Sequence, residues 1–236
     1  MTRRPALLLA LLLLAGAAPQ HRHAAAPAPV PLADTVRVAM LTDAGEIDLD
    51  LDGRHAPLTT ANFLRYVDLH RFDGASFYRV MKLDWGVQPN GLIQGGLSGD
   101  PRKVLPPVAH EPTSQTGILN TAGAISMARF APGSATADFS ILLSDQPGLD
   151  ADPTATDPDR RAGFAAFGHV VAGMDVVRAI FALPRSPTRG EGVMKGQMLS
   201  DPVRILSVRR IALAAAPAPV APVAPDKPSA AAPPPG

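Results

Sequence analysis

Cysteine is absent from this chain of 236 residues, and aromatic residues are scarce, at 5% of the composition. Without cysteine the chain has no disulfide, thiolate zinc site, iron–sulfur cluster or cysteine nucleophile. An excess of one charge is also lacking, because 22 Lys and Arg stand against 21 Asp and Glu, for a formal net charge of +1. With no global positive charge to attract phosphates, we expect no nucleic-acid partner.

Proline is abundant, with 26 residues, and many of these lie near the two ends of the chain. Residues 20–31 and 214–236 are rich in Ala and Pro and have almost no large apolar side chains. Such segments cannot bury enough apolar surface to offset the entropy of ordering, so we predict extended tails.

The N-terminus has the pattern of a secretory signal peptide. A short cationic region precedes residues 6–15, which are all Ala or Leu, and small residues follow at 16–18. The apolar run is too short to span a bilayer, which takes about 20 residues. We place cleavage after Ala17 or Ala18, with a second candidate site at 24–26. We therefore expect a periplasmic or secreted protein, with no membrane span in the mature chain.

These features predict one folded domain with flanking segments. The order is a signal peptide at 1–18, an Ala/Pro-rich linker at 19–33, the folded domain at 34–213 and an Ala/Pro-rich tail at 214–236.

Short apolar strands predominate within the predicted domain. Apolar residues alternate over 36–40 and over 47–51, and the turn residues at 43–45 predict a hairpin between them. A helix is predicted from Pro57 to the Asp73-Gly74 turn, and a second over 174–183. Further strands are predicted at 76–81, 92–94, 124–128, 139–143, 165–171 and 203–213. Many short strands with two separated helices favour a mainly β fold, a closed antiparallel barrel capped by two α-helices.

Alternation along the last predicted strand, residues 203–213, assigns its side chains to two faces. Val203 and Ile205 fall on one face, and Val208 falls on the opposite one.

Asp48, Asp50, Asp52 and Gly53 match the opening of a calcium-binding EF-hand loop. The twelfth position of that loop is Thr59 rather than Glu, and the segment alternates like a strand. We therefore interpret the aspartates as the solvent-facing side of a strand. The histidines of the domain show no ligand spacing, and we expect no metal, nucleotide or other cofactor.

Six segments carry a recognisable signature in a fixed order. Residues 76–80 read Ser-Phe-Tyr-Arg-Val, residues 92–96 read Leu-Ile-Gln-Gly-Gly, and residues 124–128 read Ala-Ile-Ser-Met-Ala. The other three segments are Ala137–Ile141, Gly148–Asp150 and Phe164–Met174. Together they resemble the cyclophilin-type peptidyl-prolyl cis-trans isomerases over nearly all of the predicted domain. The resemblance implies an eight-stranded antiparallel barrel with two capping helices, and acceleration of rotation about X-Pro bonds.

The resemblance also implies site residues for a non-covalent mechanism. Arg79 matches the family's catalytic arginine, which donates a hydrogen bond to the prolyl nitrogen and so weakens its conjugation with the carbonyl. Gln94 matches the glutamine that holds the substrate carbonyl and helps to orient the arginine. Leu92, Ala128 and Leu149 match positions that line the proline pocket or its rim. The implied partners are proline-containing polypeptides, and we expect a monomer.

Several pocket positions depart from the family's pattern. Ser140 stands at the aromatic floor of the pocket, Phe164 replaces a histidine, Gly148 replaces a tryptophan and Arg129 replaces an asparagine. We expect weaker catalysis than in relatives with the full motif, because an aromatic floor contributes burial of about 2 to 3 kcal/mol. Our hypothesis is that Phe164 moves into the space left by Ser140, so both are candidate substrate-binding residues.

An extra stretch separates Arg79 from Gln94, over residues 81–91. Gly91 falls where the family has a pocket phenylalanine. The loop is expected to project beside the site, where Trp85 either supplies the missing aromatic face or is simply exposed.

Three interpretations remain open. The first is an exported prolyl isomerase that assists the folding of envelope or secreted proteins, which Arg79 and Gln94 favour. The second is a weakly active or inactive proline-binding chaperone or scaffold, which Ser140 favours. The third is a structural protein whose proline-rich tails matter more than its barrel.

Overall fold

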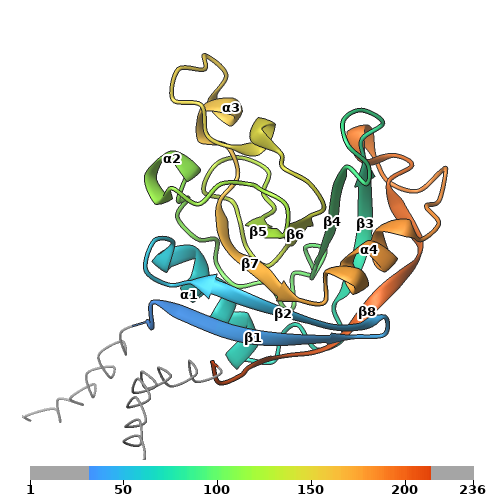
Figure 1. The fold of residues 1–236 in the computed structure, drawn as a ribbon, viewed down its shortest axis with the longest axis horizontal. Helices are drawn as coiled ribbons and strands as arrows, with labels where there is room; N and C mark the ends of the chain where they lie inside the picture. The colour runs from blue at the N-terminus through green and yellow to red at the C-terminus, as the bar shows by residue number, and fades with distance from the viewer. Residues whose placement is uncertain (1–31, 214–236) are drawn as a thin grey trace, which may run out of the picture. The chain divides into compact units, whose positions relative to one another are not determined.

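A computed structural model describes residues 32–213. The predicted signal peptide at 1–18, most of the predicted linker and the tail at 214–236 lie outside the described residues. The described part contains eight strands and four α-helices (Figure 1). The strands are β1 (Thr35–Thr42), β2 (Gly45–Asp52), β3 (Ser76–Lys82), β4 (Gly91–Gly96), β5 (Ala124–Met127), β6 (Phe139–Leu142), β7 (Ala166–Ala172) and β8 (Met198–Arg210). The helices are α1 (Pro57–Asp68), α2 (Thr113–Thr116), α3 (Pro158–Ala162) and α4 (Met174–Ala182), with 3₁₀ turns η1 (Pro147–Leu149) and η2 (Gly192–Met194).

The eight strands form a closed barrel in which every neighbouring pair is antiparallel. Their order around the barrel is β1-β2-β7-β5-β6-β4-β3-β8. The longer helices, α1 and α4, both insert apolar side chains into the core, and α1 lies against β2, β7 and β8. The predicted mainly β fold, a closed eight-stranded barrel with two capping helices, is confirmed. In the described residues no helix is long and apolar enough to cross a membrane.

The barrel interior is filled by a cluster of phenylalanines. Phe63 of α1 packs against Phe72, Phe139 and Phe167, with ring centroids 4.9 to 5.5 Å apart. Phe139 also meets Phe77 edge to face, at 5.8 Å. All five rings are buried. The few aromatic residues of the chain are therefore concentrated where they bury the most apolar area.

Helix α1 ends earlier than predicted. The prediction carried it to the turn at 73–74, whereas the helix stops at Asp68 and His70 adopts a left-handed conformation with φ of 54°. The Arg71 amide then donates to the Tyr66 carbonyl at 2.9 Å, which closes the helix end.

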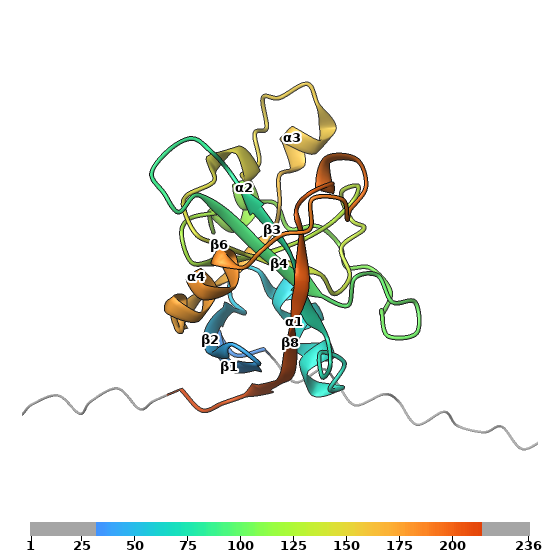
Figure 2. The same cartoon turned by 90° about the vertical axis from the view of Figure 1, so that its right-hand side faces the viewer.

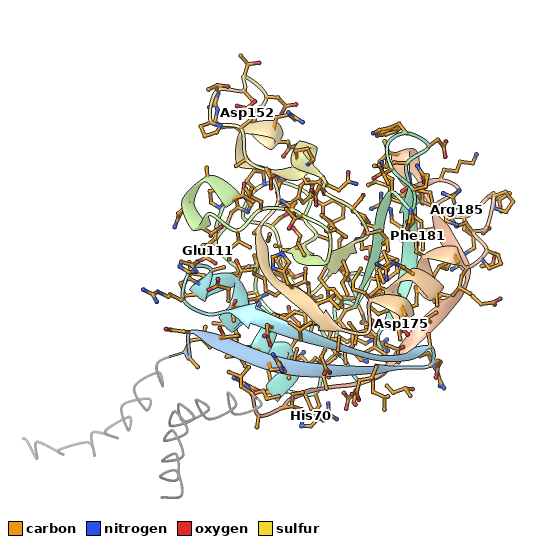
Figure 3. The ribbon with its side chains drawn as sticks, in the orientation of Figure 1. His70, Glu111, Asp152, Asp175, Phe181 and Arg185 are labelled. Atoms are coloured by element: carbon orange, nitrogen blue, oxygen red, sulfur yellow. The ribbon has the colours of Figure 1, made fainter. Side chains whose placement is uncertain are left out.

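The N-terminus of α1 is capped from a distant part of the chain. The helix has no cap from its own N-cap residue. Instead the buried carboxylate of Glu111 accepts from the amides of Leu58 and Thr59, at 3.1 and 2.7 Å (Figure 3). A carboxylate at this end also complements the helix dipole.

The alternation predicted for the last strand is wrong, because β8 contains a bulge. It begins at Met198 rather than Val203, and it has a register shift where Leu41 pairs with Ser207 but Thr42 pairs with Ile205. Such a bulge adds a residue to one strand and reverses which side chains face inward. Val208 is therefore buried on the same side as Val203 and Ile205, not on the opposite face.

The aspartates of β2 lie in a regular strand, as interpreted from the sequence. Asp50 forms a two-point ion pair with Arg37 of β1, with N–O distances of 2.7 and 2.8 Å. Asp52 instead accepts from the backbone and side chain of His55 after the strand. These contacts give Asp50 and Asp52 partners within the domain and involve no metal.

Candidate active site

The site is built on one row of residues that crosses four neighbouring strands. Arg79 of β3 pairs with Gln94 of β4, Gln94 pairs with Ser140 of β6, and Ser140 pairs with Ser126 of β5. Residues directly opposite each other in antiparallel strands have Cβ atoms about 5 Å apart and point to the same face. The ladder register therefore brings the four side chains together.

The row faces out of the barrel because its neighbours along each strand face in. Val80, Ile93 and Phe139 belong to the core. On β3 the register shifts between Phe77 and Arg79, so that Tyr78 and Arg79 both line the outer face.

A pocket of about 640 Å³ opens over this row. Its lining includes every residue that the sequence predicted for the site, namely Arg79, Gln94, Leu92, Ala128, Ser140, Leu149 and Phe164. The side facing β8 is completed by Met198 and by Val193 and Met194 of η2. The structure thus brings the predicted residues into a single cavity, whose lining includes two arginines, Arg79 and Arg129.

Hydrogen bonds hold the Arg79 guanidinium at the pocket. Nη1 donates to Gln94 Oε1 at 2.6 Å, and Nε and Nη2 both donate to Gln197 Oε1, at 2.9 and 2.6 Å. Burial lowers the pKa of Arg79 from its ordinary value, because the protein solvates the charge less well than water does. The half-buried charge is partly shielded from solvent, which strengthens its interaction with a bound polar group.

Gln94 is itself oriented by a buried tyrosine. Its Nε2 donates to the Tyr78 hydroxyl at 2.8 Å, so its Oε1 faces Arg79. Burial raises the pKa of Tyr78, which therefore stays protonated. Burial likewise raises the pKa of the neighbouring Asp138, although the backbone amide of Ser98 donates to its carboxylate at 2.8 Å.

On one wall of the pocket the Arg129 guanidinium stacks on the ring of Phe164. The Arg129 guanidinium carbon lies 4.6 Å from the Phe164 ring centroid, and the Arg129 side chain is only 2% exposed. Arg129 is fixed by the carbonyl of Gly163, to which Nη2 donates at 2.7 Å. The stack keeps the Phe164 ring at the pocket, although contact with the space beside Ser140 stays a hypothesis.

The loop between β3 and β4 contributes no residue to the pocket lining, although Met81, at the start of the extra stretch, does. Trp85 is 66% exposed and is not part of the lining, which favours the interpretation of a simple exposed loop. Gly91 has a φ of 137°, and a Cβ there would lie 1.9 Å from the Met81 carbonyl oxygen. No side chain fits at this position in this backbone, so a phenylalanine here would need a different path of the chain. A Cβ at Gly91 would also lie 3.2 Å from the ring of Phe181, a residue of α4 (Figure 3).

Sequence reasoning missed three polar groups of the site as functional residues. Gln197 comes from the far end of the domain and belongs to none of the six signature segments. Asp138 lies within a signature segment, and its position next to Phe139 in an alternating strand could have placed it on the outer face. Ser126, also in a signature segment, has a buried hydroxyl with no hydrogen-bond partner among the described residues.

Comparison with known proteins identifies relatives over most of the described residues. The family model for cyclophilin type peptidyl-prolyl cis-trans isomerases matches residues 37–210. Over 182 residues, 75% of this chain and 86% of the relative, the chain is 36% identical to a peptidyl-prolyl cis-trans isomerase of Acinetobacter baylyi. It is 37% identical over 150 residues to peptidyl-prolyl cis-trans isomerase A of Dickeya dadantii, which is 62% of this chain and 71% of that protein.

Solved structures share the fold. A crystal structure of a Cryptosporidium parvum cyclophilin type peptidyl-prolyl cis-trans isomerase, in the presence of the dipeptide Ala-Pro, aligns with a TM-score of 0.59. The alignment covers 75% of this chain and 99% of that one, at 18% sequence identity. At this identity the likeness supports the barrel architecture alone.

Proposed function

The chain belongs to the cyclophilin-type peptidyl-prolyl cis-trans isomerase family, and from that premise we propose that it accelerates rotation about X-Pro bonds in polypeptide substrates. The observation that carries the proposal is the Arg79 guanidinium, held by two amide side chains at an apolar pocket. A proline ring would enter the pocket beside Leu92 and Phe164, with its nitrogen next to Arg79.

The chemistry that follows is non-covalent. Rotation about a peptide bond has a barrier of about 18 to 20 kcal/mol, because the nitrogen lone pair is shared with the carbonyl. In the twisted transition state the lone pair is released from conjugation and can accept a hydrogen bond. An N–H of Arg79 that donates to this nitrogen stabilises the transition state more than either planar ground state, which is the condition for catalysis.

Gln94 has two roles in this proposal. Its Oε1 accepts from Arg79, and its amide lies at the pocket, where it would contact the carbonyl of the substrate. Tyr78 fixes the orientation of the amide. The direct test is a protease-coupled assay on an Ala-Pro peptide in the presence of a chelator, since the mechanism needs no metal. A protein that does not raise the isomerisation rate under these conditions would contradict the proposal.

Export is part of the proposal. The support is the pattern at residues 1–18, a short cationic region followed by an Ala/Leu run and small residues. Substrates would then be envelope or secreted proteins in the course of folding. N-terminal sequencing of the mature protein from its host would test this, and an N-terminus at Met1 would contradict it.

A second candidate function, a proline-binding chaperone of low activity, is favoured by Ser140. Its small polar side chain is 8% exposed at the pocket, in the row that also holds Gln94. A hydroxyl there contributes less apolar contact to a proline ring than an aromatic side chain would. Peptide binding without a measurable rate increase would support this function over the first.

Replacing Phe164 by alanine should lower kcat/KM for an Ala-Pro peptide by about tenfold, mainly through a higher KM. The ring supplies apolar contact area to the pocket, and fully burying such a side chain is worth about 1.5 to 3 kcal/mol. Phe164→Leu keeps an apolar wall and should retain most of the activity. Leu69→Ala, an exposed position outside the pocket lining, serves as a control. Unchanged kinetics in Phe164→Ala would contradict the role of the ring.

A further inference from the structure

Gln197 lies beside Arg79 because of the pairing between β3 and β8. Arg79 pairs with Met198, the first residue of β8, so the residue before it reaches the same edge of the pocket. Figure 2 shows β8 running along the barrel beside β3. We propose that Gln197 is a positioning residue, which holds the Arg79 guanidinium in the orientation needed for the reaction. This inference rests on the proposed function.

The amide of Gln197 is fixed on both sides. Its Oε1 accepts from Nε and Nη2 of Arg79, at 2.9 and 2.6 Å, while its Nε2 donates to the Val193 carbonyl at 2.8 Å. Since Nε2 can only donate and Oε1 can only accept, turning the amide over would lose all three hydrogen bonds. The orientation of the acceptor is therefore determined by the η2 turn.

The backbone of Gln197 is anchored as well. Its amide donates to the Met194 carbonyl at 3.0 Å, and its carbonyl accepts from the Val80 amide at 2.9 Å. Val80 directly follows Arg79 in the chain. The acceptor and the arginine are thus tied to the same short piece of sheet, which limits their relative movement.

The Arg79 guanidinium keeps N–H donors for a substrate. A guanidinium has five N–H groups. Gln197 takes the N–H of Nε and one of Nη2, and Gln94 takes one of Nη1. One N–H on Nη1 and one on Nη2 are left over. Gln94 and Gln197 thus fix the guanidinium and still leave donors for the prolyl nitrogen.

The two side chains that hold the Arg79 guanidinium, Gln94 and Gln197, are neutral amides. A carboxylate at either position would hold the guanidinium more strongly but would also neutralise it. With Gln94 and Gln197 the arginine keeps its full positive charge for the transition state. Among the described residues no carboxylate forms an ion pair with Arg79, so the guanidinium is held in a fixed orientation by neutral groups.

The kinetic test is the variant Gln197→Met, which keeps an unbranched side chain of similar length and removes the acceptor. We expect kcat/KM for an Ala-Pro peptide to fall about tenfold, mostly in kcat, because the donor acts in the transition state. Gln115→Met, at an exposed position outside the pocket lining, should match the wild type. If Gln197→Met does not fold, as judged by circular dichroism, Gln197→Ala takes its place. A rate within twofold of the wild type would overturn the inference.

A double-variant cycle shows whether Gln197 acts through Arg79. In an Arg79→Ala background, adding Gln197→Met should change kcat/KM by less than about twofold, because the group that Gln197 positions is gone. A further tenfold loss in that background would mean that Gln197 acts on the site in another way, and would overturn the inference.

A spectroscopic measurement separates this inference from the proposed function. The Arg79 Nε–H resonance, assigned by its absence in Arg79→Ala, should be protected from exchange with water in the wild type and lose that protection in Gln197→Met. Protection that persists in Gln197→Met would overturn the inference whatever the activity. If protection is lost as expected but the wild type has no isomerase activity, the proposed function fails and the contact stands.

Discussion

Replacing Arg79 by alanine should lower kcat/KM for an Ala-Pro peptide by about a hundredfold to a thousandfold, the range seen when one pre-oriented transition-state donor is removed from a site. The effect should be large because Gln94 and Gln197 hold the Arg79 guanidinium at the pocket, and partial burial limits the water that could replace it. The decrease should appear mainly in kcat, since the hydrogen bond forms with the released lone pair of the transition state. The protease-coupled assay measures both parameters.

Two controls accompany this variant. Arg54→Ala removes an exposed arginine that lies outside the pocket lining. Among residues 32–213 its side chain forms an ion pair only with Asp34, at 3.9 Å, so the kinetics should match the wild type. Thermal unfolding of Arg79→Ala should stay cooperative, because the core residues behind Arg79 are unchanged. Equal rates for Arg79→Ala and wild type would remove the enzyme interpretation and leave the proline-binding chaperone.

The strands could be predicted from the sequence because their side chains fill an apolar barrel interior. Alternation identified β1 and β2, and short apolar runs identified β3 to β7, each to within two residues at either end. The prediction was wrong where a bulge interrupts the alternation, as it does before Val208. A bulge depends on the pairing between two strands, and a single strand's pattern does not contain that information.

The ends of the helices were less predictable for a similar reason. The cap of α1 is the Glu111 carboxylate, which comes from more than fifty residues further along the chain. Helix α3 lies in a segment for which no helix was predicted, and its first turn is capped by the side chain of Asp157. Local signals such as Pro57 at a helix start are visible in sequence, whereas a cap from a distant segment is not.

The residues of the candidate site were also predictable only in part. Arg79, Gln94 and the predicted apolar lining were accessible through the signature segments, and the structure brings them to one pocket. Gln197 was not accessible, because its contact with Arg79 joins residues 118 positions apart and depends on the pairing of β3 with β8. The stack of Arg129 on Phe164 likewise involves two positions where the chain departs from the family's pattern, and their contact follows from the fold alone.

Replacing Phe139 by alanine should lower the free energy of unfolding by about 3 to 5 kcal/mol, the usual cost of removing a large aromatic side chain from a core. Phe139 is fully buried and makes edge contacts with Phe63, Phe72 and Phe77, so several rings lose a neighbour at once. The surrounding strands belong to a closed barrel, which limits how far they can collapse into the cavity. Chemical denaturation with linear extrapolation measures the change.

Phe130→Ala is the matched control for this prediction, because it makes the same chemical change at a side chain that is 89% exposed. Its free energy of unfolding should stay within about 0.5 kcal/mol of the wild type. A loss below about 1 kcal/mol in Phe139→Ala would show that the ring cluster is not the main source of the barrel's stability. A decrease of about 3 to 5 kcal/mol in the free energy of unfolding of Phe139→Ala would also bear on the pocket. Ser140 follows Phe139 in β6 and points to the pocket, so the residue that stabilises the interior also fixes the strand that carries the pocket floor.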